Sequence, residues 1–491
     1  MPSSTIRTVA VIGAGASGIS AAAASALSAE DHFEKIRVFE RRETSGGTWL
    51  YDADPGAPLI PIPGQLPPDI DPELQRPRHL PARTEPSTQE RYLKTPVYAD
   101  LTTNVPDIAM SFSDNPFPYG PFVPHWVPKQ CIQSYFSHCR TDSCLQLNTT
   151  VEDLTKLPGE RWALTLRRHD PTINQDLWWR EDFDALILAN GHYTIPFIPA
   201  VPGLPEYLET FPGKVFHSKS YRDPHTFAGK KILVIGSSAS GYDIGRDLVK
   251  TVQLPLYQSR RSRNRLEPPT PPEGFVWKPV ITRYDADSGD IHFQDGSVLG
   301  GNQINHVIYC TGYLPSFPFW NNDANGGPFW DYRGNRMLDN YQHTFLTNHP
   351  TLGIVGMIQA LTFRSFEYQA IALARLFAGR AALPGRVEQQ QWYQGRVAQV
   401  TRERRKFHAL YWDDGETLGW FRWLYDFAGL PQLTGPGKVP PVIDAKTRWA
   451  IEHIKKHTDN PNDGIDSEQD GNEDGWFVVR DKTHWDTLFF I

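Results

Sequence analysis

Two stretches of the chain repeat one pattern: an apolar run, a glycine turn and then a helix-forming stretch. In the first, residues 9–12 are apolar without polar alternation, which is typical of a parallel strand buried on both faces. Good helix formers, mostly alanine, continue to about Leu27, and a second strand pattern covers residues 36–39. The order strand, helix, strand predicts a βαβ unit near the start of the chain.

The turn between the first strand and its helix carries a dinucleotide fingerprint. It reads Gly13-Ala14-Gly15-Ala16-Ser17-Gly18, in the form G-x-G-x-x-G. The first glycine permits a tight turn, the second lets the backbone approach a pyrophosphate, and the third allows helix and strand to pack closely. Glu40 ends the second strand, where a carboxylate accepts hydrogen bonds from a ribose diol. Three turn glycines in an unrelated loop are the plain alternative.

The second stretch lies some 220 residues later and differs at informative positions. A strand pattern at residues 231–235 leads into Gly236-Ser237-Ser238-Ala239-Ser240-Gly241. Ser238 stands where the first site has its middle glycine, so we expect the backbone to stay farther from a pyrophosphate. The hydroxyl groups of Ser237, Ser238 and Ser240 are candidate donors to phosphate oxygens instead.

The strand after this second turn ends in basic residues, Arg260 and Arg261, instead of an acid. A carboxylate would repel a ribose 2′-phosphate, whereas an arginine binds it bidentately. The first site therefore suits FAD, and the second suits NADPH rather than NADH. A solvated basic loop shared with Arg263 and Arg265 is the alternative interpretation of the two arginines.

Length, charge and cysteine content narrow the class of protein. At 491 residues, two domains or one domain inserted in another are expected. A net charge of −7 gives no basic footprint for nucleic acid. No apolar stretch approaches the roughly 18 residues of a membrane span, and the start of the chain leaves no room for a signal peptide. Four cysteines without a Cys-x-x-Cys pair argue against zinc and a dithiol centre, and favour the cytoplasm.

Shorter motifs follow in a fixed order along the chain. Residues 211–221 read FPGKVFHSKSY and fit F-x-G-x-x-x-H-x-x-x-[YF], and residues 46–49 read GGTW. Residues 98–106 carry Tyr98, Leu101, Thr103, Asn104 and Pro106 at fixed spacing. Two strand ends resemble Ala-Thr-Gly linkers, with Asn190 and Cys310 in place of the usual residues, and residues 359–369 contain Gln359, Thr362 and Phe363.

With these motifs the chain resembles the flavin-containing monooxygenases, particularly their soluble fungal and bacterial members, over roughly residues 6–380. The resemblance implies an α/β fold with two nucleotide-binding Rossmann-like domains, the NADPH domain being inserted into a discontinuous FAD domain. The expected boundaries are 1–205 for the first part of the FAD domain, 206–324 for the NADPH domain, and 325–491 for the second part with an aromatic-rich extension. Tyr221 departs from the related Baeyer–Villiger monooxygenases, which carry tryptophan there.

The resemblance also implies which residues contact the cofactors. In the family, the residue aligned with Asn104 is an uncharged donor near the reactive edge of the flavin, which makes Asn104 the candidate catalytic residue. A loop asparagine that caps a turn before Pro106 is the alternative. The expected cofactor contacts, with no metal ligand among them, are Gly13, Gly15, Ala16, Ser17, Gly18, Glu40, Arg42, Gly47, Thr48, Trp49, Tyr98, Thr103, Asn104, Val151, Ser237, Ser238, Ser240, Arg260, Arg261, Gln359 and Thr362.

By this resemblance the chain is expected to be an FAD- and NADPH-dependent monooxygenase. NADPH reduces FAD, O₂ adds to the reduced flavin as a C4a-hydroperoxide, and a soft nucleophile is oxygenated at nitrogen or sulfur. The expected partners are that small molecule and O₂, with a homodimer as one candidate assembly. A Baeyer–Villiger or N-hydroxylating monooxygenase, a disulfide or quinone reductase, an uncoupled NADPH oxidase and a flavoprotein redox sensor are the alternatives.

Three regions lie outside these motifs. Residues 55–96 contain eleven prolines, which predicts little regular secondary structure, and a surface insertion is favoured over a lid near the active site. After residue 380 the chain is rich in tryptophan, tyrosine and phenylalanine, for which a core or a subunit interface is favoured over a substrate entrance. Residues 459–475 are acidic and polar, typical of a flexible loop.

Overall fold

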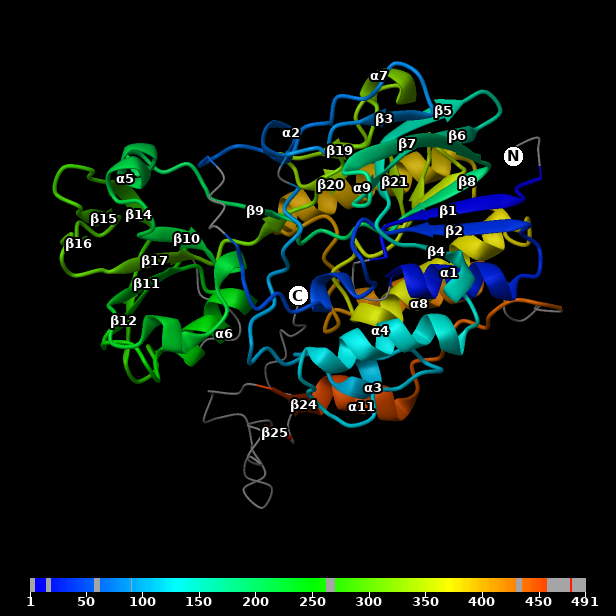
Figure 1. Cartoon of the computed structure of the whole chain (residues 1–491). Coiled ribbons are helices and arrows are strands. Elements are labelled where there is room, and N and C mark those ends of the chain that lie inside the picture. Colours follow the sequence, from blue (N-terminus) through cyan, green and yellow to red (C-terminus); the bar gives the residue numbers. More distant parts are fainter. Residues whose placement is uncertain are drawn as a thin grey trace.

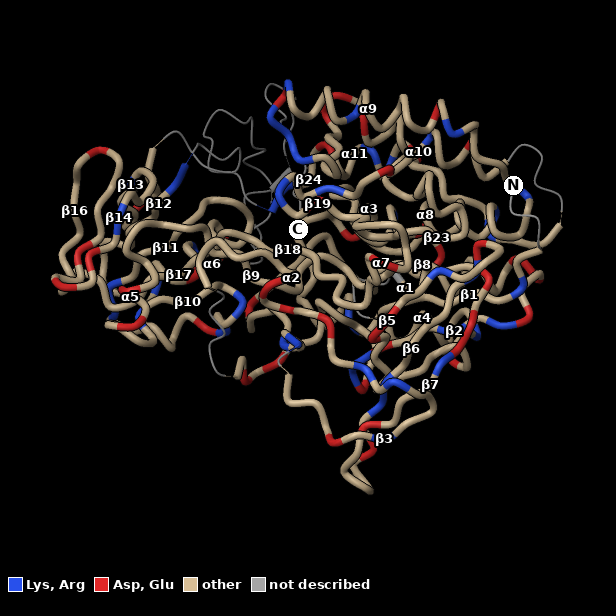
Figure 2. Tube along the Cα trace, turned by 90° about the horizontal axis from the view of Figure 1, so that it is seen from above, with Lys and Arg blue, Asp and Glu red and all other residues tan. Residues whose placement is uncertain are grey.

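The chain folds into two lobes, each built on its own sheet (Figure 1). The sheet of the smaller lobe is parallel, and that of the larger lobe is parallel except for the pairs β21–β22 and β22–β23. The computed structural model describes residues 5–14, 19–56, 62–89, 91–261, 270–429 and 435–456, together with the backbone of residues 477 and 478. Acidic and basic residues are interspersed over both lobes (Figure 2). The predicted flexible loop at 459–475 lies outside the described residues.

The larger lobe contains a seven-stranded sheet in the order β21-β22-β23-β8-β1-β2-β4. Strand β1 pairs in parallel with β2 on one side and β8 on the other, and the pairing of β1 with β2 is the one that the βαβ prediction requires. The strands are β1 (Thr8–Ile12), β2 (Lys35–Phe39), β4 (Leu145–Gln146), β8 (Ala185–Leu188), β21 (Asn340–Tyr341), β22 (Phe345–Leu346) and β23 (Leu352–Ile354).

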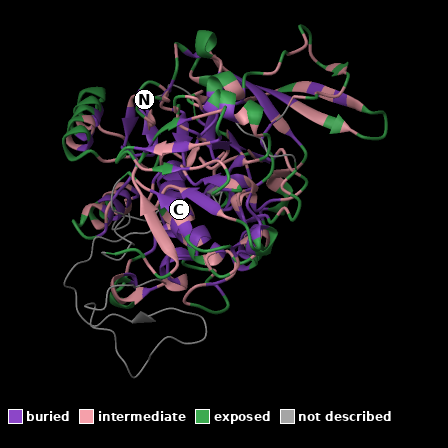
Figure 3. Ribbon diagram, turned by 90° about the vertical axis from the view of Figure 1, so that its left-hand side faces the viewer, coloured by how far each residue is buried: buried purple, intermediate pink, exposed green. Residues whose placement is uncertain are grey.

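Alternate residues of β1 face opposite layers. Val9 and Val11 pack in one core with the alanines of α1 (Ile19–Ala29) and apolar residues of α8 (Thr362–Phe377), while Ala10 packs on the other face against β6. That second layer is an antiparallel sheet of β3 (Ala82–Thr84), β7 (Gln175–Phe183), β6 (Arg161–Asp170) and β5 (Thr150–Leu157). Because both faces are covered, β1 and β8 are almost entirely apolar and buried, whereas β2 carries the partly buried Lys35 and Arg37. Figure 3 shows buried segments in the interior of the molecule.

The smaller lobe repeats this design. Its five parallel strands are β10 (Val215–His217), β17 (His306–Tyr309), β11 (Ile232–Ile235), β12 (Leu256–Ser259) and β13 (Phe275–Lys278), in that order. Helix α6 (Ala239–Leu248) packs on one face. A three-stranded sheet of β14 (Ile281–Tyr284), β15 (Ile291–Phe293) and β16 (Val298–Leu299) packs on the other. The prediction of two Rossmann-like units in an α/β fold is therefore confirmed.

Two short strands join the lobes. β9 (Ile195–Pro196) and β18 (Tyr313–Leu314) pair in antiparallel fashion, and each follows one of the two predicted linkers. All five strands of the smaller sheet come from residues between these crossings, whereas the larger sheet takes strands from both sides of them. Phe317 and Trp320 already pack in the core beneath the larger sheet. The boundaries predicted at residues 205 and 324 remain a proposal.

The aromatic-rich region after residue 380 forms part of the core, which is one of the two interpretations favoured from the sequence. Trp412, Trp420 and Phe421 are buried in the same cluster as α1 and α8, and Trp392 and Trp423 pack against it. The remaining elements are η1 (Gly47–Trp49), α2 (Pro67–Ile70), α3 (Asp107–Met110), α4 (Trp126–His138), η2 (Asp142–Cys144), α5 (Leu204–Thr210), η3 (Ser218–Ser220), η4 (Pro224–Phe227), α7 (Asn322–Asn325), β19 (Trp330–Asp331), β20 (Arg336–Met337), α9 (Arg386–Glu403), α10 (Glu416–Phe427), α11 (Ala445–His453), β24 (Ile454–Lys455) and β25 (Phe477–Val478).

Candidate active site

The first glycine turn brings the end of β1 against the first linker. Gly13 has a φ of +96°, and a Cβ atom on it would stand 2.9 Å from the carbonyl oxygen of Ala189. Only glycine fits both the left-handed backbone and this close approach. The turn thus has the geometry that its sequence predicts. Gly15, Ala16, Ser17 and Gly18 lie outside the described residues, so their contacts stay predictions.

Glu40 directly follows β2 beside this turn, and its side chain is buried. Its carboxylate accepts hydrogen bonds from the backbone N–H groups of Ala14 (2.7 Å) and Arg42 (2.8 Å). Burial raises the pKa of Glu40, and the Arg42 N–H and the guanidinium of Arg41 act in the opposite direction. Each carboxylate oxygen keeps a lone pair that a ribose hydroxyl can use.

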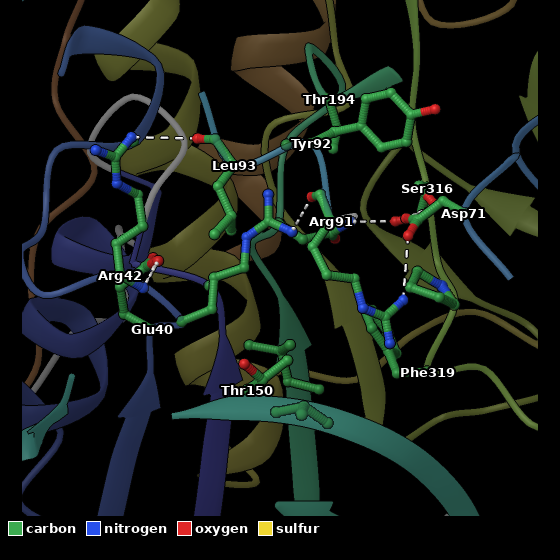
Figure 4. Close-up of a pocket in the computed structure, with 18 of the residues that line it drawn as sticks. Glu40, Arg42, Asp71, Arg91, Tyr92, Leu93, Thr150, Thr194, Ser316 and Phe319 are labelled. Atoms are coloured by element: carbon green, nitrogen blue, oxygen red, sulfur yellow. Dashed lines mark hydrogen bonds and ion pairs between the residues drawn. The ribbon is translucent and has the colours of Figure 1, made fainter. Parts of the chain in front are cut away.

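A pocket opens beside Glu40 and encloses about 1030 Å³ of empty space, part of it open to solvent (Figure 4). Six of the predicted cofactor residues line this pocket. They are Gly13, Glu40, Arg42, Gly47, Thr48 and Val151.

Basic side chains are concentrated in the pocket, as a ligand with two phosphate groups requires. Arg42 pairs with Asp52 (2.8 Å), and Arg41 donates a hydrogen bond to the carbonyl of Arg91 (3.0 Å). Burial lowers the pKa of Arg41. The side-chain carbonyl oxygen of Asn190, at the linker, is buried without a partner among the described residues. Positive charge, an unpaired acceptor and a glycine cradle together fit FAD.

Part of the pocket wall comes from the proline-rich segment, which corrects the expectation of a surface insertion. Asp71 and residues 91–96 line the pocket. Arg91 binds Asp71 (3.1 Å), and Ser316 donates to the other oxygen of Asp71 (2.6 Å), as Figure 4 shows at the far end from Glu40. Arg91 also binds Glu152 (2.7 Å). These residues belong to no dinucleotide motif, so nothing in the sequence pattern marked them.

Arg41 was also missed, although its position carries a signal. It directly follows Glu40 at the end of β2, and in a βαβ unit this strand end faces the nucleotide. A basic residue there is a candidate contact for the same ligand.

The second glycine turn reproduces the first. Gly236 has a φ of +107°, and a Cβ atom on it would stand 2.5 Å from the carbonyl oxygen of Cys310 in the second linker. Helix α6 begins directly after Ser238, whose hydroxyl makes no capping bond to it. Ser237 lies on the same turn, and Ser240 is the second residue of α6. The two linkers therefore hold the two glycine turns through equivalent contacts.

The predicted 2′-phosphate residues lie at the end of β12. The guanidinium of Arg260 lies over the ring of Trp277, and its backbone N–H donates to the carbonyl of Lys278 (2.9 Å). Arg261 is exposed. The stacking orients a planar cation at the edge of the second nucleotide site, as recognition of a phosphate requires.

Residues 98–104 run between the two lobes. Tyr98 donates a hydrogen bond to Asp243 of α6 (3.2 Å), and burial raises its pKa. Thr103 exchanges two hydrogen bonds with Val123, between Thr103 N–H and the Val123 carbonyl (2.8 Å) and between Val123 N–H and Thr103 Oγ1 (3.0 Å). Asn104 is buried, and its Oδ1 atom has no partner among the described residues. The buried, incompletely bonded amide leaves Asn104 available to a ligand.

The remaining predicted contacts lie on a separate stretch. Gln359 donates its backbone N–H to the carbonyl of His408 (2.8 Å), and Thr362 is the first residue of α8 with a buried, unpaired hydroxyl. Trp49 in η1 is buried with its indole N–H unpaired. None of the three lines the pocket beside Glu40, so their cofactor contacts stay predictions.

The described part of the chain contains neither a metal centre nor a membrane-spanning helix. No group of three or more histidine, cysteine, aspartate and glutamate side chains is placed to hold a metal ion. None of its helices combines the length and apolar character of a membrane span. All four cysteines are free thiols.

Comparison with known proteins identifies the family. Residues 87–285 match the Flavin-binding monooxygenase-like family, and residues 11–72 match an NAD(P)-binding Rossmann-like domain. The flavin-containing monooxygenase FMO GS-OX2 of Arabidopsis thaliana is 30% identical over 431 residues, covering 84% of each chain. The flavin-containing monooxygenase ustF2 of Aspergillus flavus is 29% identical over 446 residues, covering 80% of this chain and 86% of that protein.

Solved structures agree on the fold. S-allyl-L-cysteine S-oxygenase from Allium sativum superposes with a TM-score of 0.70 at 24% identity, covering 91% of this chain and 92% of that one. Tmm from a Pelagibacter strain superposes with a TM-score of 0.61 at 22% identity, covering 80% of each. From the extent of these matches and the two dinucleotide turns, the chain belongs to the flavin-containing monooxygenases, oxidoreductases that use FAD and NADPH.

Proposed function

We propose that this monooxygenase binds FAD in the pocket beside Glu40, binds NADPH at the turn after β11, and transfers one oxygen atom of O₂ to the nitrogen or sulfur of a small molecule. The observation that carries the proposal is the pair of equivalent turns. Gly13 and Gly236 each abut one of two linkers that pair through β9 and β18. Two dinucleotides bound at these turns would lie on either side of the paired linkers.

The site residues have three roles, which are to bind FAD, to bind NADPH and to donate a hydrogen bond near the flavin. Glu40 holds a ribose through its carboxylate, and Arg41, Arg42 and Arg91 supply positive charge around it. Arg260 binds the 2′-phosphate that distinguishes NADPH from NADH. When bound and reduced, the flavin supplies the chemistry that activates O₂.

Asn104 serves as a neutral hydrogen-bond donor at the reactive edge of the flavin. Its amide is uncharged at all working pH values, so it donates without releasing a proton. Burial keeps water away from this position, and exclusion of water protects a reactive oxygen species from breakdown. The name of the Allium sativum protein, an S-oxygenase, supports sulfur as one acceptor atom.

Assembly and location complete the proposal. The four free cysteines support a cytoplasmic protein, because thiols persist in a reducing compartment. A homodimer is the proposed assembly, by resemblance to the family. Light scattering on the purified holoenzyme tests it, and a monomer mass would refute it.

Anaerobic mixing of the yellow protein with NADPH tests the division of the two sites. The proposal predicts rapid loss of the oxidised flavin absorbance with NADPH and much slower loss with NADH at equal concentration. Equal rates with the two would refute the assignment of the second site to NADPH.

A further inference from the structure

Residues 91–95, which we call the strap, contact two parts of the molecule at once. On one side all five residues line the pocket beside Glu40. Arg91 is fixed there by Asp71 and Glu152, at 3.1 and 2.7 Å. The strap is therefore part of the proposed FAD site and is held by ion pairs of its own.

On its other side the strap accepts hydrogen bonds from two buried cations. Lys219 Nζ donates to the carbonyl of Tyr92 (3.1 Å) and to that of Thr194 in the first linker (2.5 Å). Arg222 donates to the carbonyl of Thr95 (3.0 Å). Both side chains are only 7% exposed. Neither residue lines the pocket.

Arg222 donates hydrogen bonds to backbone carbonyl groups of three segments. Besides Thr95, it donates through Nε to the carbonyl of Asp52 (2.5 Å) and through one terminal nitrogen to those of Lys219 (2.8 Å) and Tyr221 (2.7 Å). A buried guanidinium is stable only while such partners satisfy its donors. Movement of the strap would leave the Arg222 donor that binds Thr95, and the Lys219 donor that binds Tyr92, each short of a partner, so the strap and residues 219–222 are expected to move together.

Residues 219–222 are continuous with the smaller lobe. They follow β10 directly, and the hydroxyl of Tyr221 donates to Asp247 of α6 at 2.6 Å. Helix α6 begins at the second glycine turn. An unbroken set of contacts thus runs from the pocket wall through Arg222 and Tyr221 to the helix of the second nucleotide site.

We propose that the strap couples occupation of the FAD pocket to the position of the NADPH-binding lobe, with Lys219 and Arg222 as the positioning residues. The inference rests on the proposed function, which places FAD in the pocket beside Glu40. A ligand that orders the strap also fixes the hydrogen bond from Arg222 to the carbonyl of Thr95. Coupling between two binding sites is reciprocal, so NADP⁺ must tighten FAD binding by the factor by which FAD tightens NADP⁺ binding.

The test measures the FAD dissociation constant by diluting the holoenzyme and recording the fluorescence of released flavin, with and without NADP⁺. Arg222→Met changes no residue that lines the pocket, yet it should weaken FAD binding by about tenfold or more and abolish the effect of NADP⁺. Lys214→Met is the matched control. Lys214 is a half-buried cation of the neighbouring 211–221 motif, and it donates to the carbonyl of Gly301 inside the smaller lobe (2.9 Å) instead of to the strap.

The control should keep both the native FAD affinity and the effect of NADP⁺. The FAD affinity of Arg222→Lys should lie between those of Arg222→Met and the native protein, because a single ammonium group cannot bind all the carbonyls that the planar guanidinium group bridges. An Arg222→Met holoenzyme with FAD affinity within about twofold of native and an intact NADP⁺ effect would overturn the proposal.

Hydrogen exchange on the native protein, compared before and after FAD is restored to flavin-depleted enzyme, keeps the proposal testable if Arg222→Met does not fold. Loading with FAD should slow amide exchange in residues 91–95 and in residues 219–222 together. Protection of residues 91–95 alone would contradict the coupling. Glu40→Ala separates the test of the FAD site from the test of the coupling. If Glu40→Ala leaves FAD binding unchanged, the proposed FAD site is wrong. If Glu40→Ala loses FAD but Arg222→Met does not, only the coupling through the strap is refuted.

Discussion

The guanidinium carbon of Arg260 lies 3.3 Å from the centroid of the Trp277 ring. Both residues lie at the same edge of the smaller sheet, since β12 and β13 are parallel neighbours. The ring holds the guanidinium plane in one orientation, which reduces the entropy lost when a phosphate binds. Trp277 is therefore part of the proposed 2′-phosphate site, although no sequence motif marks it.

Replacement of Arg260 by alanine should weaken NADPH far more than NADH. A hydrogen bond to a charged group contributes about 1.5–3 kcal/mol, so we expect NADPH binding to weaken by about 30-fold. NADH lacks the 2′-phosphate and should change by less than about threefold. Titration of both nucleotides against the holoenzyme measures this.

Arg283→Ala is the control for that change. Arg283 is half-exposed in the same lobe and pairs with Asp285 at 3.2 Å. It should leave both affinities unchanged. Equal losses of NADPH and NADH in Arg260→Ala would mean that another residue holds the phosphate.

Asn104→Ala should retain FAD and NADPH yet divert turnover to hydrogen peroxide. The change removes a buried neutral donor whose Oδ1 has no partner among the described residues, so the local fold loses few contacts. Without the donor, we expect hydrogen peroxide release to rise to most of the NADPH consumed. The ratio of product to NADPH measures it.

Asn104→Asp sharpens the same test, because it keeps the shape of the side chain and replaces the donor by an anion. It should uncouple at least as strongly as alanine. A variant of either kind that still couples product to NADPH one to one would remove Asn104 from the catalytic set.

Gly13→Ala should abolish FAD retention. The new Cβ would stand 2.9 Å from the Ala189 carbonyl oxygen, in a backbone conformation with φ +96°. Gly159→Ala has a similar conformational cost (φ +79°) but meets nothing within 4 Å. We expect Gly159→Ala to lose only about 1–2 kcal/mol and keep its flavin. Flavin content per purified chain compares the two, and a fully yellow Gly13→Ala protein would contradict the turn geometry.

Stability should fall as the pH falls below about 6.5. Burial lowers the pKa of His217 and of His408 to about 3 and that of His192 to about 4. Below about pH 6.5 these histidines become protonated in the unfolded chain, whereas in the folded protein they stay neutral. The free energy of unfolding is therefore at its full value above that pH and decreases as the pH falls toward the folded pKa values. Each group contributes up to about 1.4 kcal/mol per pH unit.

Melting temperatures of His408→Asn and of the native holoenzyme at pH 7.5 and 5.5 check this effect. His408 Nε2 accepts a hydrogen bond from the backbone of Met337 (3.2 Å), a role that asparagine can keep. The variant should lose less stability between the two pH values, and an unchanged difference would show that His408 does not resist protonation. Comparison with the native protein removes the contribution of the carboxyl groups, which is opposite in sign for Glu40 and Glu367, whose pKa values are raised by burial.

Local patterns predicted the elements around both nucleotide turns. The strands expected at 9–12 and 36–39 are β1 and β2, and the strand expected at 231–235 is β11 within one residue at its start. These succeed because a strand buried on both faces is apolar throughout and its turn needs glycine, and both features are visible within a few residues.

Features set by contacts between distant residues escaped prediction. Asp71, Arg91 and Ser316 meet in the pocket although up to 245 residues separate them, and no short motif encodes such a meeting. The proline content of residues 55–96 correctly indicated little regular structure, but proline says nothing of what a segment packs against. Arg222 was equally invisible, because its partners are backbone carbonyls, which carry no sequence signature.

The measurement that tests the central claim most directly is oxygen labelling of the product. The holoenzyme is supplied with NADPH and ¹⁸O₂ and with a thioether, a tertiary amine and a hydroxylamine in separate reactions. We predict that at least one product carries a single ¹⁸O atom, formed in equal amount to the NADPH consumed. Hydrogen peroxide equal to the NADPH consumed, with no labelled product from any of the three, would contradict the assignment as an oxygenase of soft nucleophiles.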